Sequence, residues 1–166
     1  MITTIEEFKT DYKQESDNTL KLLKALTDAS LNQSVAKDHR TIGRMGWHLI
    51  TTYPEMCGFA GLTYQGVAKE SPMPKSAAEF VKAYETVSTA TLSSVSKWSD
   101  ADLMTEKNFY GENWKLGLML EILIRHEIHH QAQMTVLMRQ AGLKVPGMYG
   151  PSFEEWAGIG MNPPTV

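Results

Sequence analysis

Residues 114–141 read WKLGLMLEILIRHEIHHQAQMTVLMRQA and give the clearest indication of the fold class. Its apolar residues recur at steps of three and four, which is the period of an α-helix that buries one face. Gly142 follows directly and predicts the end of the helix, because glycine readily takes the left-handed conformation that closes many helices. Between Leu116 and Ile124 the stretch is apolar almost all round, which predicts deep burial or a helix–helix contact between two copies of the chain.

Three further segments show the same helical period. Apolar residues spaced by three and four predict helices over residues 4–27, 41–61 and 76–97. Pro54 lies inside the second of these and should bend or interrupt it, because proline has no backbone N–H to donate. Ser76 and Glu79 have the spacing of a capping box, which opens the third helix.

Four helices without an alternating strand pattern, a repeat or a linker predict an all-α chain. A length of 166 residues suits one domain, so we expect a single four-helix bundle over residues 1–166. The segment 110–113 has the composition of a connector, and a short helix is expected over residues 152–157.

Composition excludes several classes of protein. A formal net charge of −3 offers no basic face for nucleic acid, and the apolar run 116–124 is about half the length that a membrane span needs. Cys57 is the single cysteine, so no internal disulfide can form, as is usual in a reducing compartment. The first residues lack the basic and apolar regions of a signal peptide. We therefore expect a cytoplasmic protein.

Three of the five histidines lie within the segment His126-Glu127-Ile128-His129-His130. His126 and His130 are four residues apart and share one helix face, within the stripe expected to be buried. Two buried imidazoles are unfavourable unless each has a hydrogen bond or a metal, so the pair favours a metal site over two ordinary core histidines. His129 falls toward the edge of the stripe and Glu127 on its flank.

A metal held by this pair needs a third ligand from elsewhere. His39 lies in a polar connector, where a solvated side chain is expected. His48 lies at the rim of the apolar stripe of its helix, so periodicity alone leaves the choice between the two open. Cys57 is half a helical rotation from His48, which makes it a buried apolar residue rather than a ligand.

The sequence resembles the DinB/YfiT-like family of helical metalloenzymes. The resemblance covers essentially the whole chain and rests on TIGRMGWHL at 41–49, HEIHHQAQM at 126–134 and VPG at 145–147. In that family one histidine of the second helix and two of the last hold a divalent metal. Carried over, the ligands are His48, His126 and His130. The resemblance also implies long crossover connections between the helices and a homodimer.

Such a site would leave coordination positions open, as catalytic metal sites do. An open ion can lower the pKa of bound water to about 7 or hold a thiol as its thiolate. Nitrogen donors accept Zn, Ni, Mn, Fe or Co, with Zn or Ni expected first. The resemblance implies an S-transferase that joins a low-molecular-weight thiol, such as bacillithiol, to a small electrophilic substrate.

Two other functions stay open. His126, Glu127 and His130 also fit the H-E-x-x-H pattern of zinc hydrolases, in which the glutamate activates water, although that pattern is short. The chain could instead be a stress protein that binds a metal or a small molecule without chemistry. Gln131 and Gln133 are candidates to orient a ligand histidine, with ordinary packing as the alternative.

Overall fold

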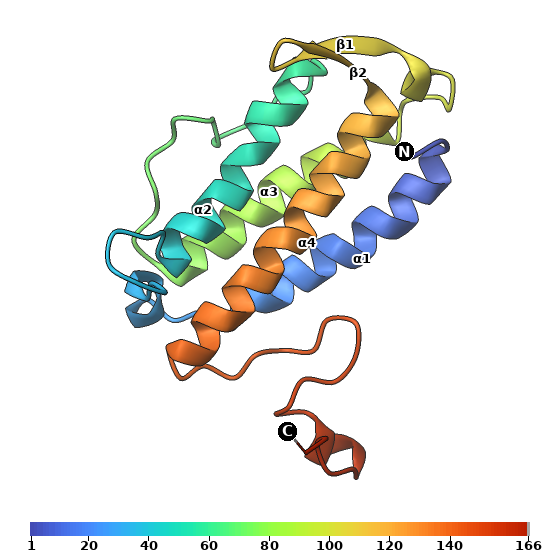
Figure 1. Cartoon of the computed structure of the whole chain (residues 1–166). Coiled ribbons are helices and arrows are strands. Elements are labelled where there is room, and N and C mark those ends of the chain that lie inside the picture. Colours follow the sequence, from blue (N-terminus) through green and yellow to red (C-terminus); the bar gives the residue numbers. More distant parts are fainter. Residues whose placement is uncertain (166) are drawn as a thin grey trace.

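The computed structural model describes residues 1–165 of the chain. Four helices lie side by side (Figure 1): α1 (Ile5–Lys24), α2 (Ile42–Thr52), α3 (Ala77–Val95) and α4 (Leu116–Gln140). Both α1 and α2 pack against α3 and α4, which encloses a core between all four. The four helices expected from the periodicity are therefore confirmed. None of the helices in residues 1–165 is both long and apolar enough to cross a bilayer.

Pro54 interrupts the second helix, as the sequence predicts. The α-helical part of α2 ends at Thr52, and a π-helical turn follows over Tyr53–Cys57. Because Pro54 cannot donate a backbone hydrogen bond, the regular ladder cannot continue through it. Cys57 at the end of this turn is fully buried, as expected for a small apolar residue.

A long connection joins α2 to α3. Residues 58–76 run back along the helices, so α2 and α3 point in the same direction (Figure 1). Trp47 packs on Phe80, and Tyr53 packs on Tyr84, as two helices running in parallel require. The backbone N–H of Ser76 donates to the carboxylate of Glu79 at 3.2 Å, the contact predicted for the start of α3.

A β-hairpin corrects the prediction of an all-α chain and of a plain connector at 110–113. In the connection from α3 to α4, strands β1 (Glu106–Phe109) and β2 (Glu112–Lys115) pair antiparallel as a two-stranded sheet. The turn residues Tyr110 and Gly111 have φ values of 54° and 94°. Two positive values match the turn whose twist suits a two-residue hairpin. The chain is thus mostly helical, with one small sheet.

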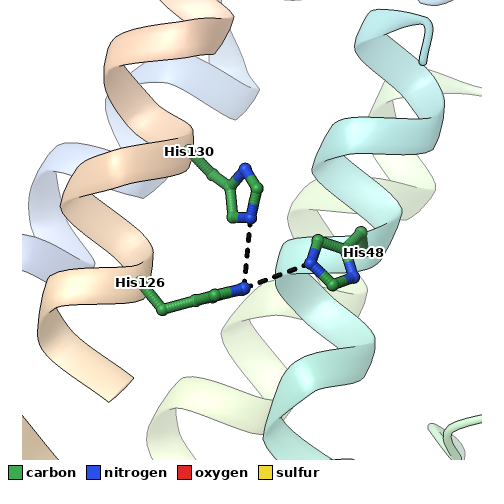
Figure 2. Close-up of side chains that lie close together, drawn as sticks. All are labelled: His48, His126 and His130. Carbon is green, nitrogen blue, oxygen red and sulfur yellow. Dashed lines mark hydrogen bonds between the residues drawn. The ribbon is translucent and has the colours of Figure 1, made fainter. Parts of the chain in front are cut away.

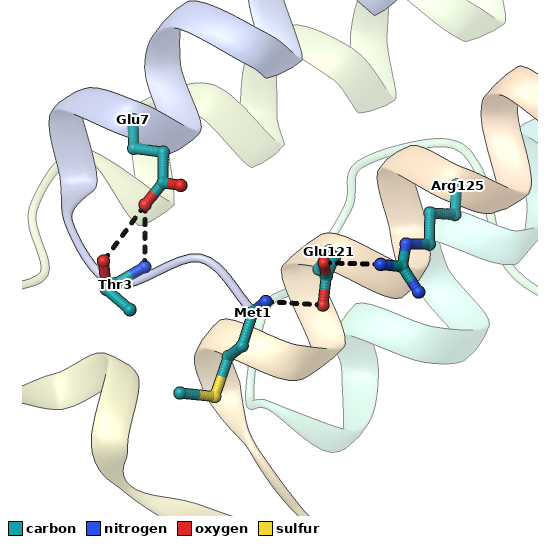
Figure 3. Close-up of polar contacts among 5 residues, drawn as sticks. All are labelled: Met1, Thr3, Glu7, Glu121 and Arg125. Carbon is teal, nitrogen blue, oxygen red and sulfur yellow. Dashed lines mark hydrogen bonds and ion pairs between the residues drawn. The ribbon is translucent and has the colours of Figure 1, made fainter.

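The first residues of the chain fasten the start of α4 (Figure 3). The amino group of Met1 forms an ion pair of 2.8 Å with Glu121, which also pairs with Arg125 at 2.8 Å. A Cβ atom on Gly117 would lie 2.1 Å from the carbonyl oxygen of Ile2, so only glycine permits this approach. These contacts hold the N-terminal end of α4 in place, the helix that carries His126 and His130.

The last segment departs from the expected helix over residues 152–157. A 3-10 turn forms over Trp156–Ile159 instead and ends at Gly160, which has a positive φ of 73°. None of the residues of this turn is buried, so it contributes no side chain to the core.

Candidate metal centre

Three histidines from two helices meet between α2 and α4. His126 and His130 project from α4 toward His48 on α2 (Figure 2). The Nε2 atom of His126 lies 3.1 Å from Nε2 of His48 and 3.1 Å from Nε2 of His130. One ring nitrogen of each residue lies within 4.8 Å of the other two, close enough for one ion to touch all three.

Hydrogen bonds among the rings cannot serve all three nitrogens. A ring nitrogen carries either one N–H or one lone pair, so Nε2 of His126 can form a single good hydrogen bond. It nevertheless lies at hydrogen-bonding distance from both of its neighbours. A cation between the rings would accept all three lone pairs, and three imidazole nitrogens are a usual donor set for a divalent metal. The residues therefore fit a metal ion.

Gln133 orients one of the rings. Nδ1 of His130 lies 2.7 Å from Oε1 of Gln133, and an amide oxygen only accepts, so Nδ1 carries the proton. The lone pair of His130 is then on Nε2 and faces the other rings. Gln131 instead contacts α1, because its amide N–H donates to the Thr19 hydroxyl at 2.9 Å. Of the two glutamines that the sequence offers as orienting partners, only Gln133 contacts a histidine of the cluster.

The surroundings of the rings disfavour their charged forms. Burial, followed by the positive charges of Arg40 and of His130, lowers the pKa of His48 to about 4. Burial and the neighbouring histidines lower the pKa of His126 to about 3, and burial also lowers that of His130. The three rings are therefore neutral at pH 7, the form that offers lone pairs.

The other histidines remain outside the cluster. His39 is exposed, and its Nδ1 lies 2.9 Å from the carbonyl oxygen of Lys37. His129 is exposed as well, with its ring 5.0 Å from the ring of His130, and it offers no nitrogen to the group. Of the two histidines between which periodicity left the choice open, the structure brings only His48 to the pair on α4.

Glu127 points away from the histidines. Its side chain is fully buried, and it accepts hydrogen bonds from the hydroxyl of Tyr84 and, at 3.1 Å, from that of Thr19. Burial raises the pKa of Glu127 to about 7, although these hydrogen bonds act in the opposite direction. A glutamate that activates metal-bound water must reach the ion. The position of Glu127 therefore gives no support to the hydrolase alternative.

Sequence reasoning missed the hydroxyl network that three buried tyrosines add, although Tyr12, Tyr53 and Tyr84 each fall at an apolar position of the helical period. The hydroxyl of Tyr12 donates to that of Tyr53 at 3.1 Å, and the hydroxyls of Tyr53 and Tyr84 lie 3.3 Å apart. All three rings are at most 1% exposed. A buried tyrosine hydroxyl usually has a polar partner. That requirement is the signal that could have predicted a shared polar core.

A cavity opens beside the cluster on the side of His130. Its volume is about 470 Å³, and His130 and Gln133 form part of its wall. Val35, Met45, Val136 and Leu137 give it a large apolar surface, and His39, Arg40 and His129 complete the lining. A small apolar molecule could therefore approach the histidines from this side.

Comparison with known proteins places the chain in a family. Residues 1–164 match the profile of the DinB family. The chain belongs to the DinB family. The uncharacterized protein YrdA of Bacillus subtilis (strain 168) is 41% identical over 167 residues, which cover 100% of both proteins. Membership confirms the resemblance seen in the histidine-containing segments of the sequence.

Two solved structures of DinB-like proteins share the fold. One, from Bacillus cereus, is 43% identical, with a TM-score of 0.85 over 90% of this chain and 100% of its own. The other, from Bacillus subtilis, has a TM-score of 0.68 over 86% of this chain and 97% of its own, with 14% identity. The second likeness concerns the fold alone. The helical arrangement is therefore shared within the DinB family.

Proposed function

We propose that this DinB-family protein is a metal-dependent enzyme whose His48, His126 and His130 bind one divalent ion. The observation that carries the proposal is the meeting of three Nε2 atoms, of which the central one lies 3.1 Å from both others. Neutral rings in this arrangement have more lone pairs facing one point than hydrogen bonds can use. Zn or Ni is expected first, and Mn, Fe or Co suits the same nitrogen donors.

The reaction we propose is S-transfer from a low-molecular-weight thiol, such as bacillithiol, to an electrophilic small molecule. The ion, when bound, supplies positive charge that keeps a thiol in its thiolate form. The thiol proton passes to solvent, the sulfur forms a bond to the electrophilic carbon, and the leaving group departs with the electron pair of the broken bond. Gln133 holds His130 in the tautomer that this role needs, and the apolar cavity of about 470 Å³ suits the electrophile.

Two observations favour a thiol over water as the nucleophile. The glutamate of the H-E-x-x-H pattern, Glu127, is bound to Tyr84 and Thr19 and lies away from the rings. No other carboxylate joins the three histidines in the ligand group found within residues 1–165. A hydrolase of this kind needs a base beside the ion, whereas a thiol becomes a strong nucleophile through its lowered pKa alone.

The test is an assay of thioether formation with and without metal. Protein loaded with Zn or Ni, and protein treated with a chelator, are incubated with bacillithiol, cysteine or coenzyme A and with 1-chloro-2,4-dinitrobenzene. We expect turnover with at least one thiol in the loaded protein only, a loss of about 100-fold or more in His126→Ala and no loss in His129→Ala. Stoichiometric thiol binding without turnover would establish the non-catalytic alternative.

The proposal includes the wider setting of this activity. We propose that residues 1–166 form one four-helix bundle domain that acts in the cytoplasm as a homodimer. The homodimer rests on the resemblance to the DinB family, because Leu116, Met119 and Leu120 at the start of α4 are buried within the chain itself and are not free for a dimer contact. Light scattering after size-exclusion chromatography separates monomer from dimer.

A further inference from the structure

A second cavity adjoins the histidine cluster from the side of α2. Its volume is about 280 Å³, and His48 forms part of its wall. Three cationic side chains, Arg40, Arg44 and Lys69, line it, against a single acidic one, Glu70. The chain as a whole has 19 acidic and 16 basic residues, so this concentration of positive charge runs against the overall balance.

The two arginines have no partner within residues 1–165. Neither guanidinium takes part in an ion pair or a side-chain hydrogen bond there. Lys69 differs, because it pairs with Glu55 at 3.0 Å. The positive charge available to a ligand in this cavity is therefore mainly that of Arg40 and Arg44.

One wall of the cavity is held in place by the protein. The indole N–H of Trp47 donates to the carbonyl oxygen of Ser71 at 2.8 Å, which ties the loop after α2 to that helix. Trp47 and Ser71 both line the cavity. The concave shape beside His48 is thus supported by a contact between two distant segments.

Electrostatics favours an anion in this cavity. Like charges gathered around one concavity repel one another, and a divalent ion on the adjacent histidines would add to the repulsion. A bound carboxylate would relieve it, and the planar fork of a guanidinium matches the two oxygens of a carboxylate. The volume suits a small ligand of this kind.

The two cavities that reach the histidines therefore differ in chemistry. The one beside His130 is largely apolar, and the one beside His48 is cationic. Arg40 lines both, so the two lie next to each other around the cluster. A two-substrate reaction at the histidines could use one for each substrate.

We infer that the cavity beside His48 binds a carboxylate of the thiol cosubstrate through Arg40 and Arg44, while the electrophile occupies the apolar cavity. This inference rests on the proposed S-transferase function. It identifies the thiol as a small anionic one and makes Arg40 and Arg44 determinants of thiol specificity.

Binding of two thiols to the cobalt-loaded protein tests the inference without an activity assay. Mercaptosuccinate carries two carboxylates, whereas 1-thioglycerol is neutral, and either thiolate produces an absorption band when it binds cobalt. We expect mercaptosuccinate to bind about tenfold more tightly than 1-thioglycerol, and Arg40→Gln and Arg44→Gln each to remove about tenfold of its affinity. Neither variant should alter the binding of 1-thioglycerol. Arg125→Gln, on the exposed side of α4, is the matched control and should change neither.

The outcomes separate the inference from the function on which it rests. Equal affinities for the two thiols, with no response to either arginine variant, would overturn the anion site while the thiolate band still supported an S-transferase. A cobalt-loaded protein that shows no thiolate band with either thiol would overturn the proposed function, and the inference with it.

Discussion

Adjacent residues of α4 send polar side chains into two regions with opposite outcomes. Glu127 and Gln131 face α1 and α3, where Thr19 bonds to both and Tyr84 to the former. His126 and His130 face α2, and their Nε2 atoms meet only each other and that of His48. In the first region the protein's own side chains supply most of the hydrogen-bond partners, although Oε2 of Glu127 and Oε1 of Gln131 have none. In the second, three ring nitrogens meet whose lone pairs hydrogen bonds cannot all use.

This contrast separates a structural polar cluster from a ligand site. Buried polar groups usually have hydrogen-bond partners, and around Glu127 the protein supplies them for Oε1 of Glu127, the amide nitrogen of Gln131 and the hydroxyls of Thr19 and Tyr84. In the histidine cluster it supplies an orienting contact from Gln133 but none for the three nitrogens that meet. Residues of the first region should therefore affect stability, and those of the second should affect metal binding.

Substitution of Glu127 should have the largest effect on stability. Glu127→Ala leaves the buried hydroxyls of Tyr84 and Thr19 without their acceptor, and we expect a loss of about 3 kcal/mol in the free energy of unfolding. Glu127→Gln keeps an oxygen that can accept from both and should lose about 1 kcal/mol or less. Urea denaturation measures both. Metal affinity should stay at the parent value, and its loss in Glu127→Gln would contradict the separation of the two regions.

Substitution of Gln133, whose amide orients His130, should lower the metal affinity of the histidine cluster. Gln133→Ala deletes the acceptor 2.7 Å from Nδ1 of His130, so the ring is no longer held in one tautomer and orientation. Such partners typically contribute 10- to 100-fold to metal affinity, and we expect a loss of about that size with little change in stability. Calorimetric titration with zinc measures it. Gln140→Ala, on the exposed end of α4, is the control, and equal affinities of the two variants would refute the role of Gln133.

A substitution far from both regions provides the baseline. Gly111 in the hairpin turn has a φ of 94°, so Gly111→Ala should destabilise the protein by about 1 kcal/mol through backbone strain alone. Gly58 has a φ of −59° and open space around it, so Gly58→Ala should be close to neutral. Thermal unfolding compares the two. A change in metal affinity in either variant would show that the two regions are not independent of the rest of the fold.

Much of the fold was predictable because the helices bury one face each. Periodicity identified the four helices, the break at Pro54 and the capping box at Ser76. The hairpin was not predictable, because its strands have four residues each and carry mostly polar side chains. Its turn also places Tyr110 at a positive φ, which tyrosine seldom adopts and which no turn motif in the sequence indicates.

The site was predictable in part. The spacing of His126 and His130 indicated a shared face, but His48 was selected by the family resemblance, because a helix rim does not show what it faces. Glu127 was expected on the flank of the buried stripe, yet it is fully buried while His126 is half-buried. Counting a glutamate as polar shifts the predicted stripe, and only the hydroxyls of neighbouring helices explain why it is buried here.

Metal analysis of protein purified without added ions is the decisive test of the three-histidine metal centre. We predict about one ion per chain in the parent protein and in His129→Ala, and less than about one tenth in His48→Ala, His126→Ala and His130→Ala. The same low content in the parent after incubation with Zn or Ni, or undiminished content in the three variants, would contradict the metal centre.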